Sequence, residues 1–110
     1  MSEMSLIYST FENLADARAV GEDLVQRRFA ACVNIIPGMI SIYEWNNEFH
    51  NAEEVVLLIK TTGDKVGECM AEVRHLHPAE TPAILELPVL SGDPDYLKWL
   101  RARVDPQRNA

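Results

Sequence analysis

A mostly apolar run of sixteen residues extends from Ala30 to Trp45, and hydrophobic side chains alternate onto both of its faces. Such a β-rich run predicts a strand. If straight it would measure ~50 Å at ~3.3 Å per residue, whereas a compact chain of this length has a diameter of about 34 Å. The strand must therefore bend or protrude. Pro37-Gly38 is the expected bend, because proline lacks a ladder donor and glycine tolerates a bulge.

An acidic stretch from Asn46 to Glu54 follows this run, and we interpret it as the tip of a hairpin. It leads into a second apolar run, Val55–Thr62, which is the expected returning strand. The rest of a domain of this size is too small to cover a hairpin that is apolar on both faces. We therefore expect neighbouring copies of the chain to cover it, and a cyclic trimer is a reasonable closed arrangement.

The remaining periodicity predicts a strand and a helix before the hairpin, and a helix, a strand and a short helix after it. The expected strands are Ser5–Phe11 and Ala83–Val89, and the expected helices are Leu14–Arg28, Asp64–His77 and a last one after Asp93. Asn13, Asp64 and Asp93 are the expected N-caps, and Pro78 ends the second helix. This order predicts an α+β, ferredoxin-like βαββαβ arrangement with a C-terminal helix. Both main helices lie on one face of its antiparallel sheet.

Composition supports one globular domain and excludes several classes of protein. The 110 residues are 47% hydrophobic, which suits a single domain over residues 1–110 with a frayed tail at 105–110. The net charge of −7 disfavours nucleic acid, because phosphate binding needs clustered Lys and Arg. No apolar stretch is long enough to span a bilayer and no signal-peptide pattern opens the chain, so we expect a cytoplasmic protein without a membrane partner. Cys32 and Cys69 should stay reduced there.

The densest polar cluster follows the second helix, where His75, His77 and Glu80 surround a proline-bracketed turn. Imidazole and carboxylate groups are ordinary ligands of copper and zinc. His75 and His77 point to different sides of a helix, so we expect His75 to be solvated. Two alternatives stand for His77. It contacts a metal or small ligand, or it is a helix-terminal residue that packs against a strand and bonds a carbonyl.

Four positions in the hairpin are further candidates. Cys32 is either an inert core thiol or a group that meets His77 across an interface. Lys60 interrupts an apolar strand and must find an anionic partner unless it extends to solvent. Tyr43 and Trp45 share one face and either line a pocket or pack between subunits. No nucleophile elbow, phosphate loop or His-Glu-x-x-His motif occurs, so we predict no enzyme, and a reactive pair of Cys32 and His77 is a third hypothesis.

Five segments, in order over nearly the whole chain, resemble the CutA family of divalent-cation tolerance proteins. They are Ala31–Gly38, Ser41–Trp45, Glu54–Thr61, His77–Pro82 and Gly92–Leu100. The resemblance implies a ferredoxin-like protomer in a tight homotrimer, with long strands that pair across subunits and a shape similar to PII signalling proteins. It also implies a role in tolerance of copper and other divalent cations, without an established catalytic activity.

The resemblance implies a copper site that this chain retains in part. Some members have a cysteine and two adjacent histidines at the positions of Ser9, Leu76 and His77, so His77 alone matches here. Many members also carry tyrosine at the position of Ala79 and glycine at that of Asn47. Because a single imidazole does not make a tight copper site, other residues or symmetry-related copies must join it.

The expected function combines these residues in a trimer. We expect a divalent-cation tolerance protein that binds copper(II), another divalent cation or a small ligand at clefts between subunits, and the sequence identifies no further cofactor. The candidate metal ligands are His77, Cys32 and Glu80, and the candidate pocket residues are Lys60, Tyr43 and Trp45. The alternative is a PII-like signalling or scaffold trimer that contacts proteins through its acidic hairpin tips and binds no metal specifically.

Overall fold

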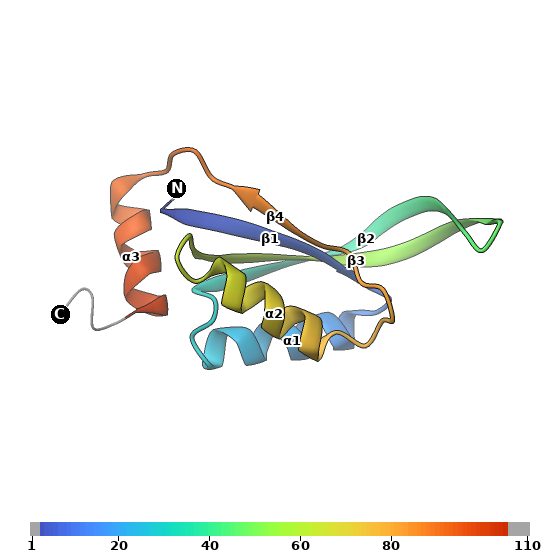
Figure 1. Ribbon diagram of the computed structural model, residues 1–110, viewed down its shortest axis with the longest axis horizontal. Helices are drawn as coiled ribbons and strands as arrows, with labels where there is room; N and C mark the ends of the chain where they lie inside the picture. The colour runs from blue at the N-terminus through green and yellow to red at the C-terminus, as the bar shows by residue number, and fades with distance from the viewer. Residues whose placement is uncertain (1–2, 106–110) are drawn as a thin grey trace.

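Seven elements follow one another in the computed structural model, which describes residues 3–105. They are β1 (Met4–Phe11), α1 (Leu14–Gln26), β2 (Cys32–Trp45), β3 (Glu48–Thr62), α2 (Val66–Leu76), β4 (Ile84–Pro88) and α3 (Pro94–Val104). The strands form one sheet in the order β2-β3-β1-β4, with every neighbouring pair antiparallel. Helices α1 and α2 cover one face of it (Figure 1). The predicted ferredoxin-like arrangement is confirmed.

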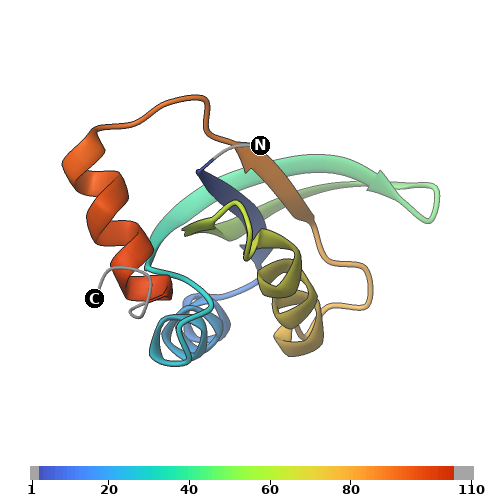
Figure 2. The same ribbon diagram turned by 60° about the vertical axis from the view of Figure 1, so that its left-hand side comes forward.

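The main core lies between the sheet and these two helices. Alternate residues of β1 and β3 point toward the helices, among them the fully buried Ile7, Phe11, Leu57 and Ile59. Leu24 of α1 packs against the same cluster. The remaining face of the sheet carries neither α1 nor α2, and both ribbon views show it open along most of its length (Figure 2).

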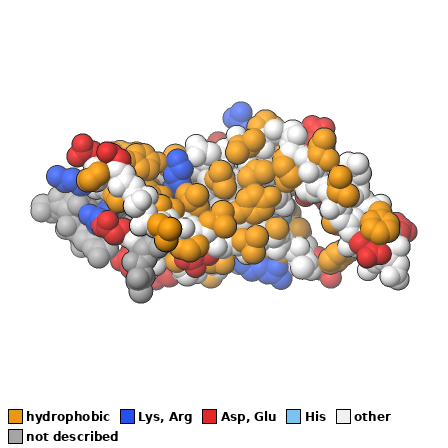
Figure 3. All heavy atoms as spheres, turned by 90° about the horizontal axis from the view of Figure 1, so that it is seen from above, with side chains coloured by type: hydrophobic (Ala, Val, Ile, Leu, Met, Phe, Trp, Pro, Cys, Tyr) orange, Lys and Arg blue, Asp and Glu red, His pale blue; other side chains and the backbone are white. Residues whose placement is uncertain are grey.

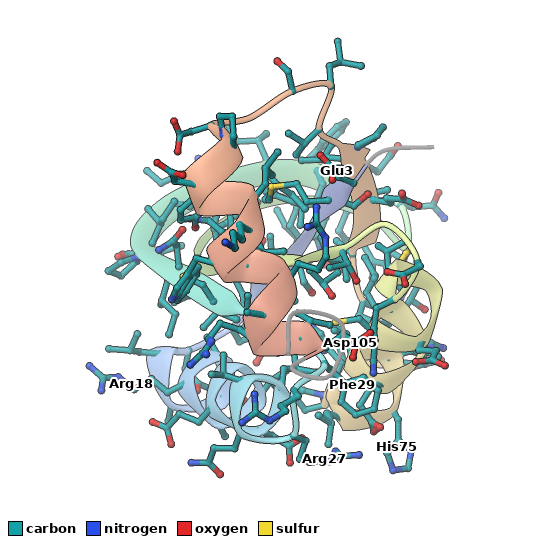
Figure 4. The ribbon with its side chains drawn as sticks, turned by 90° about the vertical axis from the view of Figure 1, so that its left-hand side faces the viewer. Glu3, Arg18, Arg27, Phe29, His75 and Asp105 are labelled. Atoms are coloured by element: carbon teal, nitrogen blue, oxygen red, sulfur yellow. The ribbon has the colours of Figure 1, made fainter. Side chains whose placement is uncertain are left out.

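Helix α3 closes one end of that open face. Its buried Leu100 and Val104 pack against Met4 and Ala31. Arg101 also donates a hydrogen bond to Glu3, which lies beside α3 in Figure 4. The proposed frayed tail lies outside the described residues, apart from Asp105 at the end of α3.

Two of the three predicted N-caps are confirmed. The side chains of Asn13 and Asp93 accept hydrogen bonds from the backbone N–H three residues further on. The third prediction is wrong, because α2 has Lys65 at its N-cap position and not Asp64. A turn closed by a hydrogen bond from the Lys65 N–H to the Thr62 carbonyl delays the start of the helix by one residue.

Helix α1 ends at Gln26, two residues before the predicted end at Arg28. Arg28 has a φ of 63°, which turns the chain out of the helix. The N–H of Phe29 donates to the carbonyl of Leu24 at 2.9 Å, and that of Arg28 to Val25 at 3.2 Å. This pair of bonds is a Schellman motif, in which the left-handed position is usually glycine.

The long hairpin bends where Pro37-Gly38 predicted it. From the pair Ile36–Val56 to the pair Met39–Glu54, β2 advances three residues while β3 advances two. Gly38 supplies the positive φ of 81° that this bulge uses. Beyond the bulge, residues 39–54 form a two-stranded arm that projects past the helices and gives the molecule its 52 Å long axis (Figure 1).

The predicted acidic tip from Asn46 to Glu54 is too long. Only Asn46 and Asn47 form the turn, with φ values of 53° and 65°, and β3 already begins at Glu48. Cross-strand pairing from Trp45–Glu48 onward holds these residues extended, although glutamate is a poor strand former. His50, expected in the tip, therefore lies within β3 and stacks on the Tyr43 ring, with 5.1 Å between centroids.

Candidate functional site

A cleft of about 500 Å³ lies where the arm leaves the sheet, and we call it the arm-root cleft. Tyr43 and Trp45 of β2 line one side, and His77 and Glu80 of the turn after α2 line the other. Four of the six predicted site residues therefore come together in one protomer. The turn reaches the arm because Pro78 ends α2 next to the end of β1.

His77 is held by three contacts. Its Nδ1 accepts a hydrogen bond from the Ala79 N–H at 3.1 Å, so Nε2 carries the proton and donates to the Thr10 carbonyl at 2.8 Å. The ring also stacks on Phe11, with centroids 4.1 Å apart. This is the geometry of the second alternative, a helix-terminal residue bonded to a carbonyl. In this arrangement neither ring nitrogen is free to bind an ion, and His77 fixes the turn that presents Glu80.

Three carboxylates, those of Glu12, Glu54 and Glu80, line the arm-root cleft. No lysine or arginine lines it, and none of the three forms an ion pair with any residue in 3–105. Sequence reasoning missed Glu12 and Glu54, because they line the same cleft as Glu80 only once β1, the arm and the turn after α2 are packed together. Across the described part of the chain, no three His, Cys, Asp or Glu side chains converge as a group that could hold a metal ion.

Cys32 and Lys60 are cross-strand partners far from this cleft. Lys60 also pairs with Leu6 of β1, whereas His77 is hydrogen-bonded to the carbonyl of Thr10. Leu6 and Thr10 are four residues apart on β1, which corresponds to ~13 Å along the strand. Half-buried Cys32 lines a second cleft of about 650 Å³ beside α1. The predicted pair of Cys32 and His77 is therefore not assembled within one protomer.

One aromatic residue of α3, Trp99, lines this second cleft. Lys60 Nζ donates to the Tyr96 hydroxyl at 3.2 Å and lies 5.5 Å from the centre of its ring. Tyr96 stacks on Trp99, which lines the cleft with Cys32. Arg18, another lining residue, extends outward from α1 (Figure 4). The partner of Lys60 within the protomer is thus a phenol and an aromatic face.

Two positions tied to the expected copper site, and the other cysteine, do not line the arm-root cleft. Ser9 is fully buried, and its hydroxyl has no hydrogen-bond partner among the described residues. Leu76 packs against the main core. Burial raises the pKa of the Cys69 thiol to about 12, so this cysteine stays protonated and is a poor metal ligand. His75 is exposed, as expected for a solvated residue.

The family model described as CutA1 divalent ion tolerance protein matches residues 5–103 of the chain. The divalent-cation tolerance protein CutA of Thermus thermophilus is 43% identical over 101 residues, which are 92% of this chain and 96% of that protein. The CutA homolog of Xenopus laevis is 42% identical over 97 residues, 88% of this chain, which spans 64% of that longer protein.

Solved structures agree with these relatives. CutA from Xylella fastidiosa superposes with a TM-score of 0.91 and 36% identity, covering 94% of this chain and 100% of its own. The structure of the periplasmic divalent cation tolerance protein CutA from Archaeoglobus fulgidus superposes with a TM-score of 0.88 and 31% sequence identity. The match covers 93% of this chain and 99% of that chain. No helix among the described residues has the length and apolar character needed to cross a membrane. A cytoplasmic location stays a prediction, since one relative is described as periplasmic.

Proposed function

The chain belongs to the CutA1 divalent ion tolerance family, and we propose that it works as a homotrimer that binds a divalent metal ion or small ligand between subunits. One observation carries the proposal. The hairpin that exposes apolar surface for assembly also separates the candidate ligands, with Tyr43, Trp45 and Glu80 at the arm and Cys32 and Lys60 at the opposite end. Only a neighbouring copy can bring the two groups together.

The case for assembly rests on uncovered apolar surface. Ile40, Ile42 and Phe49 on the arm are 65%, 74% and 83% exposed. Leu85 and Leu87 add to the open face of the sheet, and Figure 3 shows hydrophobic side chains over this face and along the arm. An isolated two-stranded hairpin is marginally stable in water, and surface of this kind marks a protein interface. Other copies of the chain would cover it in a closed ring.

The case for a site between subunits rests on the incomplete donor set of one protomer. Because residues 3–105 contain no three-ligand group, a tight metal site needs a donor from a second chain. Glu80 and Glu54 supply oxygen ligands at the arm-root cleft. Cys32 of a neighbouring subunit is the candidate sulfur ligand, because half-buried Cys32 lines a cleft beside α1. His77 positions the turn that carries Glu80.

The alternative, a scaffold trimer without specific metal binding, draws support from one feature. Both ring nitrogens of His77 are engaged in hydrogen bonds, so the single retained family ligand is not available. In that case the exposed carboxylates of the arm, such as Glu48 and Glu53, are the surface that a protein partner meets.

Light scattering and copper titration test the proposal together. We expect a trimeric mass, and calorimetric binding of copper(II) that weakens at least tenfold in Glu80→Gln and in Cys32→Ser. Glu68→Gln is the matched control, because it removes the same charge from exposed α2 surface. A monomeric mass would refute the assembly. A trimer whose copper binding is absent, or equal in all three variants, would refute the metal site and favour the scaffold.

A further inference from the structure

Two aromatic rings of the chain are already paired with a cation. Arg27 lies 4.9 Å over Phe29 between α1 and α2, where Figure 4 shows the two side chains close together. Two carboxylates hold this guanidinium at 2.7 and 3.0 Å. Beside α3, Lys60 lies over Tyr96 in the same way. In each pair the chain supplies its own cation to the ring.

The arm-root cleft has the same components without the cation. Tyr43 and Trp45 line it, both about half exposed, together with the carboxylates of Glu12, Glu54 and Glu80. Within residues 3–105 no lysine or arginine lies over either ring or pairs with any of these carboxylates. The cleft therefore combines unpaired negative charge with two half-exposed rings, of which Tyr43 also stacks on His50 and Trp45 has no ring or cation partner among the described residues.

The chemistry of this lining favours an organic cation over a bare metal ion. A metal requires ligand atoms that converge within bonding distance, and the carboxylates do not converge as such a group. An ammonium group needs only an acceptor oxygen and a ring face within ~6 Å. Methylene groups between two ammonium groups would lie along the rings, and about 500 Å³ accommodates several of them.

We infer that the arm-root cleft binds a flexible polyamine, with its ammonium groups on the glutamates and its methylenes against Tyr43 and Trp45. This inference rests on the proposed function in that it uses the same cleft and names the class of its small ligand. It does not require the cleft to be completed by a second subunit, because every group it uses belongs to one protomer.

Spermidine is the probe. Trp45 and Trp99 are the two tryptophans of the chain, so in a Trp99→Phe background the fluorescence reports on Trp45 alone. We expect saturable quenching, and a calorimetric Kd that rises at least fivefold in Glu80→Gln and at least tenfold in Trp45→Leu. Glu68→Gln, which causes the same change of net charge on α2, should leave the Kd within twofold. Circular dichroism of each variant shows that it is folded.

Two results would overturn the inference. One is no saturable binding at 1 mM spermidine. The other is an equal loss in Glu68→Gln and Glu80→Gln, which would show that a diffuse acidic surface attracts the polyamine. Light scattering and copper titration on the same samples separate this inference from the proposed function. A monomer that binds spermidine through Trp45 refutes the trimer alone, and a copper-binding trimer indifferent to spermidine refutes the polyamine alone.

Discussion

Two serines of β1 make a matched test of how buried polar groups contribute to this fold. Ser5 and Ser9 lie on the same face of the strand, 1% and 0% exposed. The Ser5 hydroxyl donates to Glu86 Oε2 at 3.0 Å, whereas no described residue hydrogen-bonds to the Ser9 hydroxyl. The same substitution by alanine should therefore change stability in opposite directions at the two positions.

The magnitudes follow from the two environments. A buried hydroxyl without a partner costs roughly 1–3 kcal/mol, and alanine removes that cost while leaving a hole of one atom. We expect Ser9→Ala to raise the free energy of unfolding by about 1 kcal/mol. Ser5→Ala loses a hydrogen bond with a net contribution of about 1 kcal/mol. The two variants should therefore differ by about 2 kcal/mol.

Urea unfolding followed by circular dichroism measures this difference, with all samples at one protein concentration so that assembly contributes equally. For a domain of this size, 1 kcal/mol corresponds to a Tm shift of roughly 4–8 °C. The reasoning is refuted if Ser9→Ala is destabilised by 1 kcal/mol or more, since that would mean the hydroxyl has a partner in solution. It is also refuted if both variants shift equally.

Three further predictions concern other positions. Burial raises the pKa of Cys69 from its ordinary value of 9.0 to about 12. The stability that the buried neutral thiol contributes to the folded state is therefore complete below pH 9 and is lost as pH rises toward 12. Urea unfolding should show Cys69→Ala losing about 1 kcal/mol less stability than the parent between pH 8 and pH 10. Arg28→Gly should be about 1 kcal/mol more stable than Arg28→Ala by the same assay, because both lose the bond to the Arg103 carbonyl and only glycine relieves the positive φ; equal stabilities would contradict this. Asn47→Gly should raise Tm by a few degrees, since glycine suits the second position of this turn best, and an unchanged Tm would count against it.

Most of the fold follows from local signals that the sequence displays. Asn13 and Asp93 mark helix starts, Pro78 marks a helix end, and the alternation in Ser5–Phe11 marks a half-buried strand. The errors occur where pairing overrides local preference. Glu48 to Glu54 has the composition of a loop, yet each residue is held extended by its partner across the arm.

The candidate site was only partly predictable, and the reason is the single extra residue at Pro37-Gly38. Without it, Tyr43 and Trp45 would continue the alternation of Val33 and face the helix side of the sheet. The bulge reverses this alternation, so that both pair with even-numbered residues of β3 and share a face with Glu54. Pro37-Gly38 predicts a bend, but the face onto which the side chains after it turn depends on the register between β2 and β3. The chemistry of the arm-root cleft is therefore a consequence of one inserted residue in β2.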